Sequence, residues 1–283
     1  MGHPLRVGLF LRLQELSTDE LRSLWRMADE AGFDHLWGFD HLTAVGDDPG
    51  LPSYEGWAML AAMAETTQRI RIGCLVTGNL YRHPAVLAKL AVTVDHLSGG
   101  RLIVGIGASW NEPEFRMVGM PFPAPAERVR RLDEACSVLK LLWTEDRATF
   151  DGRYYRLEHA IGEPKPVQRP YPPIWIGGHG PKRTMRVVAR HADVWSSNAR
   201  SEEGHAAAAR ALEEHCRAIG RDPETIPRSV MLHWRDPDDA LARIERHRQL
   251  GFTEVVLRTD APGTRRKAEI AAREILPRCR ELG

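Results

Sequence analysis

The sequence lacks the features that mark several classes of protein. Its 283 residues contain only four cysteines (Cys74, Cys136, Cys216 and Cys279), and no two of them form a CxxC pair. Scattered thiols of this kind are typical of reduced cysteines in a reducing compartment. No run of about 20 apolar residues could span a bilayer, and residues 1–10 lack the pattern of a signal peptide. We therefore expect a cytoplasmic protein.

Neither sign of charge is in excess. Lysine and arginine together number 39 and aspartate and glutamate 38, so the formal net charge is +1. Proteins that bind nucleic acid or anionic membranes through electrostatics usually carry a clear basic excess. We therefore expect neither of these partners. The length, with 43% hydrophobic residues, instead fits one large domain over residues 1–283 that buries its own core.

Two common cofactor motifs are also missing. There is no HExxH motif, and the other histidines have no metal-ligand spacing, so no metal is expected. The first predicted strand lacks a GxGxxG motif, which argues against a doubly wound dinucleotide-binding sheet. Cys74 lies in an apolar run, where a thiol behaves as a small hydrophobic side chain rather than as a nucleophile.

What the sequence does contain is a regular alternation of strand-like and helix-like segments. The predicted strands are Leu5–Phe10, His35–Phe39, Ile70–Val76, Arg101–Ile106, Ile174–Ile176, Ala192–Ser196, Ser229–His233 and Glu254–Leu257. The predicted helices are Thr18–Ala31, Tyr54–Thr66, Pro84–Leu97, Ala126–Leu142, Pro181–Arg190, Glu202–Ile219 and Pro237–Gln249, with a last helix that reaches Leu282. Such strand–helix units predict an α/β fold, a TIM-type (β/α)8 barrel. An open doubly wound sheet is the alternative.

The alternation is interrupted once, after the fourth barrel helix. Residues 148–155 are predicted to form a β-hairpin with its turn at Asp151–Gly152. A proline-rich stretch over residues 164–173 then leads to the fifth strand. We interpret residues of roughly 148–173 as an insertion that packs beside the barrel.

Polar or glycine-rich sequence follows four of the predicted strands. These segments are Asp40–His41, Cys74–Asn79, Gly107–Asn111 and Gly177–Gly180. In αβ-barrels the loops after the strands form one rim, and the active site lies on that rim. The four segments are therefore predicted to converge on one site, although they are far apart in the sequence.

The segment Gly177–Gly180 is a candidate phosphate site. It follows a predicted strand and opens a helix whose first turn would contain Lys182 and Arg183. Exposed backbone N–H groups, the positive end of the helix dipole and nearby cations attract phosphate. The alternative is a tight turn that needs glycine only for its backbone angles. Gly107–Ser109 is a smaller version, for which a plain turn is equally acceptable.

Asp40 and His41 are candidates for proton chemistry. A carboxylate beside an imidazole can orient a substrate or transfer a proton near neutral pH, whereas a hydrogen-bonded structural histidine is the alternative. Glu112 and Glu114 are interpreted as a charged loop rather than as a paired acid and base. Aromatic rings beside strand ends could flank a planar cofactor, although core packing would explain them equally well. The tryptophans in such positions are Trp37, Trp110 and Trp175.

Three segments make the sequence similar to a known family. They are GFDHLWGFDHL (residues 32–42), RIRIGCLVTGNLYRHPAVLAKLAVTVDHLSGGRLIVGIGASW (69–110) and PKPVQRPYPPIWIGGHGPKRTMRVVARHADVW (164–195). In this order they resemble the luciferase-like monooxygenase superfamily, in particular its F420-dependent oxidoreductases. The resemblance covers most of residues 5–200. It implies a TIM-type barrel that binds coenzyme F420, or alternatively FMN, on its rim.

The resemblance also implies roles for individual residues. Asp40 and His41 would lie near the cofactor ring, where His41 would donate a proton or orient the substrate with Asp40 as its support. A cis peptide bond between Cys74 and Leu75 would lie behind the ring, and Thr77 would donate to the ring edge. The residues implied along the hydroxyl-bearing chain are Gly107, Ala108, Ser109 and Asn111. Those implied at the phosphate are Gly177, Gly178, His179, Gly180 and Arg183.

Two positions depart from the family pattern. His179 stands where similar sequences commonly have glycine, which adds a donor or cation beside the phosphate. Ser109 and Trp110 stand where the F420-dependent sugar-phosphate dehydrogenases have an acid. Their specific chemistry is therefore not expected here.

Three functions are compatible with these observations. The leading prediction is hydride transfer between F420 and a small organic substrate held under the loops of residues 43–53 and 113–125. The alternative is an FMN-dependent monooxygenase that uses reduced flavin and O2, and the third is a non-catalytic barrel that binds a phosphorylated ligand. The substrate is not identified by the sequence. Dimers are common among similar proteins, so a homodimer is one expected form.

Overall fold

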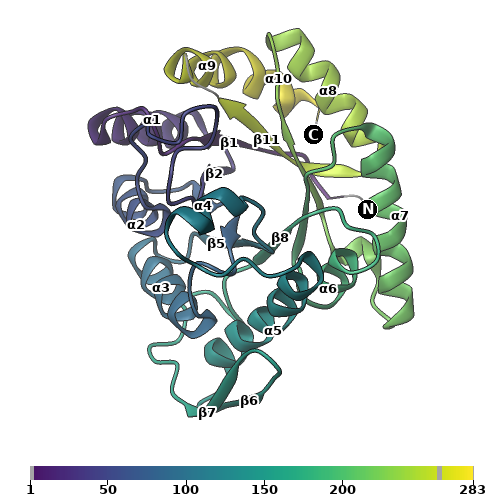
Figure 1. Cartoon of the computed structure of the whole chain (residues 1–283). Coiled ribbons are helices and arrows are strands. Elements are labelled where there is room, and N and C mark those ends of the chain that lie inside the picture. The colour runs from purple at the N-terminus through teal and green to yellow at the C-terminus, as the bar shows by residue number, and fades with distance from the viewer. Residues whose placement is uncertain (1–2, 260–262, 283) are drawn as a thin grey trace.

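The computed structural model describes residues 3–259 and 263–282, and it contains a closed barrel of parallel strands (Figure 1). The barrel strands are β1 (Arg6–Leu11), β2 (His35–Gly38), β3 (Arg71–Cys74), β5 (Leu102–Gly107), β8 (Ile174–Gly177), β9 (Val194–Ser197), β10 (Arg228–Leu232) and β11 (Phe252–Thr259). They are ordered β3-β2-β1-β11-β10-β9-β8-β5, and pairing of β3 with β5 closes the ring. The predicted (β/α)8 barrel is confirmed.

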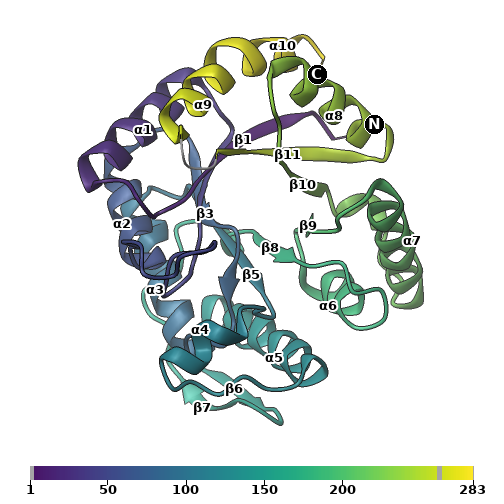
Figure 2. The ribbon, with the colours of Figure 1, turned by 45° about the horizontal axis from the view of Figure 1, so that its top comes forward.

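Helices surround the barrel on its outer side, apart from one short helix in the loop after the fourth barrel strand (Figure 2). They are α1 (Thr18–Ala31), α2 (Gly56–Thr66), α3 (Pro84–Leu97), α4 (Glu112–Met117), α5 (Pro125–Thr144), α6 (Thr184–His191), α7 (Glu202–Ala218), α8 (Pro237–Gln249), α9 (Thr264–Ile270) and α10 (Leu276–Glu281). A 3-10 turn η1 (Pro223–Thr225) precedes β10, and a π-helical turn η2 (Ala271–Ile275) joins α9 to α10. Within the described residues, no helix is both long and apolar enough to cross a membrane.

Local sequence signals explain where these elements begin and end. Helix α1 starts with a capping box, in which Ser17 and Glu20 each bond the other's backbone N–H. It ends at Gly32, whose φ of 87° is the left-handed conformation that glycine adopts without a steric penalty. The strands read as apolar runs because a parallel sheet is covered on both faces, and all six residues of β5 are buried.

The hairpin after α5 forms a separate two-stranded sheet, β6 (Ala148–Asp151) with β7 (Arg156–Ala160), which projects beside α5 (Figure 1). The predicted turn at Asp151–Gly152 is wrong, because Asp151 still pairs with Arg156 and residues 152–155 make the turn. The Glu134 carboxylate on α5 holds this longer turn. It accepts hydrogen bonds of 2.8–3.1 Å from three successive backbone N–H groups, those of Arg153, Tyr154 and Tyr155.

The strand predicted over residues 70–76 is divided by a bulge at Leu75–Val76. Strand β3 ends at Cys74, and the chain resumes beside β5 as the short strand β4 (Thr77–Gly78). The cis peptide bond predicted between Cys74 and Leu75 lies one bond later, between Leu75 and Val76. The difference arises because strand pairing continues through the Leu75 N–H, which donates to the carbonyl of Gly38 at 2.9 Å.

Three glycines on the neighbouring strands make room for this bulge. A Cβ atom at Gly105 would lie 2.0 Å from the Cys74 carbonyl oxygen. Cβ atoms at Gly107 and Gly177 would lie 2.8 and 3.0 Å from the Val76 side chain. No larger residue fits at Gly105 without moving backbone atoms, so the bulge requires glycine on the neighbouring strand.

Candidate active site

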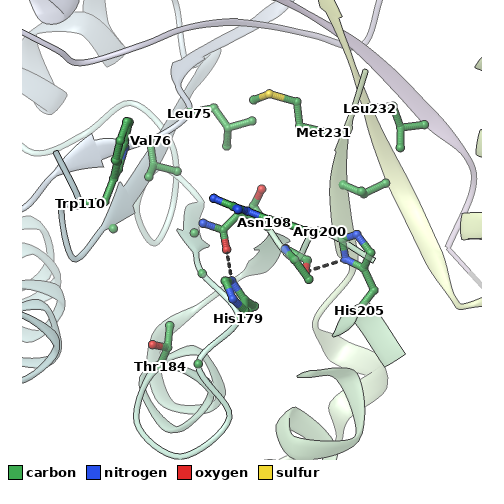
Figure 3. A pocket seen from close by; sticks show the side chains of 18 of the residues that line it. Leu75, Val76, Trp110, His179, Thr184, Asn198, Arg200, His205, Met231 and Leu232 are labelled. Atoms are coloured by element: carbon green, nitrogen blue, oxygen red, sulfur yellow. Dashed lines mark hydrogen bonds between the residues drawn. The ribbon is translucent and has the colours of Figure 1, made fainter. Parts of the chain in front are cut away.

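A cavity of about 950 Å³ opens at the carboxyl-terminal ends of the barrel strands (Figure 3). All four strand-end segments singled out in the sequence contribute to it. The predicted site residues that line it are Asp40, His41, Leu75, Gly107, Ala108, Ser109, Gly177, Gly178, His179 and Gly180. The predicted site residues that do not line it are Cys74, Thr77, Asn111 and Arg183.

Cys74 and Thr77 point into the protein wall rather than into the cavity. Both are buried, and burial raises the pKa of the Cys74 thiol well above its usual value. The Thr77 hydroxyl accepts a hydrogen bond of 3.1 Å from the indole N–H of Trp57 on α2. Leu75 and Val76 line the cavity instead, so the Thr77 hydroxyl does not lie where it could donate to a ring bound there, as had been predicted for it.

Asn111 and Arg183 lie at the starts of two helices. The Asn111 amide donates to Glu114 at 3.3 Å instead of facing the cavity. Arg183 is exposed and precedes α6, which begins at Thr184 rather than at the predicted Pro181. The helix starts late because residues 181–183 form a turn after the glycine segment. Arg183 is thereby carried to the surface.

Glu114 is the carboxylate partner of His41, and its interpretation as part of a charged loop is wrong. It lies in α4, a short helix that overlaps the predicted loop 113–125, and its side chain is fully buried. Its carboxylate accepts hydrogen bonds from His41 Nδ1 at 2.9 Å and from the Tyr81 hydroxyl at 2.6 Å. Burial alone would raise the pKa of Glu114, but the hydrogen bonds from His41 and Tyr81 outweigh it and lower the pKa to about 2.

Asp40 does not support His41. Its buried carboxylate accepts two hydrogen bonds from Arg82, at 2.6 and 2.8 Å, and Arg82 also pairs with Glu55. Burial raises the pKa of Asp40 above 3.8, although the hydrogen bonds from Arg82 oppose the shift. Successive side chains of an extended chain point to opposite sides, so neighbours in the sequence acquire different partners.

The glycine segment after β8 folds tightly onto the first turn of α6. Gly178 has φ +142°, and a Cβ atom there would lie 2.7 Å from the Thr184 methyl group. At Gly180 a Cβ atom would lie 2.8 Å from the Thr184 hydroxyl. These glycines let the backbone and the start of α6 line one end of the cavity, where amides and the helix dipole favour an anion.

The segment after β9 completes this end of the cavity (Figure 3). Asn198 lies 2.5 Å from His179 Nδ1, and the Ser197 hydroxyl lies 2.8 Å from Nδ1 of the buried His205. Burial and the neighbouring His247 lower the pKa of His205 to about 4, so its imidazole is neutral near pH 7. Arg200 lines the cavity here, and its guanidinium forms no ion pair with the residues that the structure describes.

Sequence reasoning missed Arg200, Arg82 and Glu114. The polar segment Asn198–Ser201 after β9 carries the same signal as the four segments that were chosen, so Arg200 could have been found from it. Glu114 could not, because it is 73 residues from His41 in the sequence and only the fold brings them together.

Comparison with known proteins places this architecture in a family. The family model described as "Luciferase-like monooxygenase" matches residues 4–278. The chain belongs to the luciferase-like monooxygenase family. The resemblance seen in the sequence is confirmed.

The names of similar proteins state two kinds of cofactor, F420 and reduced FMN. An F420-dependent glucose-6-phosphate dehydrogenase of Kineococcus radiotolerans is 32% identical over 251 residues, which are 87% of this chain and 73% of the relative. An FMNH(2)-dependent dimethylsulfone monooxygenase of Pseudomonas putida is 32% identical over 187 residues, 66% of this chain and 50% of the relative.

A solved structure shows the same fold over nearly the whole chain. It is an F420-dependent secondary alcohol dehydrogenase in complex with an F420-acetone adduct, with a TM-score of 0.87 and 20% sequence identity. The match covers 97% of this chain and 99% of that one.

Proposed function

We propose that this protein is an F420-dependent oxidoreductase that transfers a hydride between the deazaflavin and a small organic substrate. The observation that carries the proposal is the cavity itself, in which a glycine-lined anion site and a histidine share one barrel mouth. Its volume of about 950 Å³ lies at the upper end of the range of ~300–1,000 Å³ that ligand sites span. F420-dependent relatives among the similar sequences support the choice of cofactor.

The residues present fit such a cofactor. The apolar side chains of Leu75 and Val76 line the cavity beside Gly107 and Gly177, and they offer an apolar surface on which a flat ring could pack. The phosphate group would be held by Gly178–Gly180 at the start of α6 and by the Arg200 guanidinium. When bound, F420 supplies the hydride chemistry.

The chain itself supplies the proton-transfer group. His41 lines the cavity with 13% of its side chain exposed, and the Trp110 ring contacts it edge-on at a centroid distance of 5.6 Å. Imidazole can give or take a proton near neutral pH, as the transfer of a hydride to or from a carbonyl or hydroxyl group requires. The Asp40–Arg82 pair fixes the adjacent wall of the site.

A second candidate is an FMN-dependent monooxygenase, which the Pseudomonas putida relative favours. One scaffold hosts both reactions, so the fold does not separate them. Titration of the purified protein with F420 and with FMN does, because the two chromophores have different absorbance and fluorescence spectra. We expect saturable binding of F420, at least tenfold tighter than that of FMN.

Tight FMN binding without F420 binding would overturn the proposal in favour of the monooxygenase. Binding of F420 without reduction or oxidation by any member of a panel of alcohols, aldehydes and ketones would favour a binding-only barrel. Both outcomes are measured on the same preparation, with stopped-flow absorbance after the titration.

A further inference from the structure

Five donor groups surround the carboxylate of Glu114. Its side chain has no exposed surface. Oε2 lies 2.9 Å from His41 Nδ1, 2.6 Å from the Tyr81 hydroxyl and 3.3 Å from the Asn111 amide nitrogen. Oε1 accepts from the backbone N–H groups of Leu42 and Thr43, the latter at 3.0 Å. Both oxygens of Glu114 are therefore acceptors.

This arrangement determines where the His41 ring carries its proton. An ionised carboxylate has no hydrogen to donate, so the hydrogen in the contact between Glu114 and His41 must lie on Nδ1 of the imidazole. The neutral ring then has its lone pair on Nε2. Among the described residues, Nε2 of His41 has no hydrogen-bond partner, and the residue lines the cavity.

The position of the ring is fixed as well as its tautomer. The N–H groups of Leu42 and Thr43, which follow His41 directly, bind the same carboxylate. On the other side, the Phe115 ring stacks on the Tyr81 ring with centroids 4.8 Å apart and an angle of 9°. Helix α4, the chain after β2 and the imidazole are thus joined at one buried group.

We propose that Glu114 is a positioning residue that holds His41 as the Nδ1–H tautomer, so that Nε2 is the atom that exchanges a proton with the substrate. The inference rests on the proposed function only for the identity of the substrate. The N–H bond at Nε2 forms as the substrate loses that proton, and breaks as the substrate gains it. The imidazolium that carries this proton is stabilised by the Glu114 carboxylate in both directions of the reaction.

The tautomer can be measured without any cofactor. Histidine labelled with 15N gives distinct chemical shifts and couplings for protonated and unprotonated ring nitrogens. The His41 signals are assigned by their loss in His41→Gln and followed to the high-pH plateau. We expect Nδ1 to be protonated and Nε2 to be unprotonated in the wild-type protein. A wild-type His41 with its proton on Nε2 would overturn the proposal without any variant at Glu114.

The variant Glu114→Gln keeps the volume of the side chain but replaces one carboxylate oxygen, an acceptor, with an NH2 group, a donor. Its amide oxygen can still accept from Leu42 and Thr43, which leaves the NH2 group to donate to His41 Nδ1. We expect His41 to switch to the Nε2–H tautomer, with kcat reduced 10- to 100-fold and KM changed less than threefold. A purely structural role would lower stability and leave the tautomer unchanged, and that result would contradict the proposal.

Glu112→Gln is the matched control. Glu112 lies two residues away on α4, is exposed and forms an ion pair with Arg116. We expect the His41 tautomer, kcat and KM of this variant to equal those of the wild type. Because the NMR measurement needs no cofactor, an Nδ1–H tautomer in a protein that fails to bind F420 would reject the proposed function and leave the role of Glu114 standing.

Discussion

Two histidine–glutamate pairs lie at opposite ends of the barrel and involve histidines six positions apart in the sequence. At the amino-terminal end of the strands, His35 on β2 lies 3.2 Å from the Glu254 carboxylate on β11. At the mouth, His41 lies 2.9 Å from Glu114. Both glutamates are buried, so neither the residue types nor the burial of the carboxylate distinguishes a structural pair from a catalytic one.

The difference lies in the second nitrogen of each ring. His35 Nδ1 accepts a hydrogen bond of 2.6 Å from the Trp37 indole, and its Nε2 faces Glu254. The two groups lie within the distance of an ion pair, but they are not aligned for a hydrogen bond. The His35 side chain is 2% exposed, and its ring packs edge-on against Trp175. In His41, Nδ1 contacts Glu114 and Nε2 is left for the cavity that the residue lines. A histidine whose two nitrogens both face buried protein groups stabilises the fold, whereas one with a nitrogen directed into the cavity at the mouth can exchange protons.

Removal of His41 should give the largest effect on activity. We expect His41→Ala to lower kcat with F420 by 10²- to 10⁴-fold, the contribution typical of a general acid or base. The free energy of unfolding should also fall, by about 1–3 kcal/mol, because the buried Glu114 carboxylate loses one of its hydrogen-bond donors. Unchanged turnover in single-turnover assays would remove His41 from the reaction.

Removal of His35 should instead lower stability without affecting the binding of F420. His35→Ala removes a buried ring between two tryptophans and leaves the Trp37 indole N–H without its acceptor. We expect the free energy of unfolding to fall by about 3 kcal/mol. The dissociation constant of F420 should change less than twofold. Weakened F420 binding at a temperature where the variant is fully folded would show that the two ends are coupled.

Low pH should lower the stability that the His41–Glu114 pair contributes. The pKa of Glu114 is lowered from 4.5 to about 2 in the folded protein. Its contribution to stability is therefore complete above pH 4.5 and is lost as the pH falls toward 2. At 1.36 kcal/mol per pKa unit the loss is on the order of 3 kcal/mol. Urea unfolding between pH 6 and 2.5 should show this decline in the wild type, and a Glu114→Gln variant should lack that part of it.

The smallest effect should come from the cation at the rim. We expect Arg200→Gln to weaken F420 binding about tenfold, as the loss of one charge-assisted hydrogen bond would do. Arg183→Gln is the control, because Arg183 is exposed and does not line the cavity. It should change the dissociation constant less than twofold. Equal effects of the two substitutions would indicate long-range attraction rather than a contact at Arg200.

The contrast between the two ends also shows what sequence reasoning can reach. The alternation of strands and helices predicted the barrel, because each unit carries its own local signals of periodicity and capping. The convergence of strand ends placed His41 and Gly177–Gly180 in one cavity, since the fold dictates that geometry.

The hydrogen-bond and ion-pair partners of these side chains could not be predicted from the sequence, because they come from distant parts of the chain. The motif HLWGFDH contains both histidines, yet nothing in it indicates that one meets Glu254 and the other Glu114. The adjacency of Asp40 and His41 suggested a pair, whereas the buried Arg82 takes the carboxylate. These pairings depend on strand register and on the short helix α4, and neither produces a periodic pattern in the sequence.

The bulge at Leu75–Val76 has a consequence for pocket redesign. Gly107 and Gly177 are restricted by a side chain, that of Val76, whereas Gly105 is restricted by the Cys74 backbone. Trimming Val76 to alanine should therefore permit alanine at 107 or 177, so mutagenesis libraries should vary positions 76, 107 and 177 together. Position 105 should remain glycine in every library member, because no second-site change in a side chain can relieve a clash with the main chain.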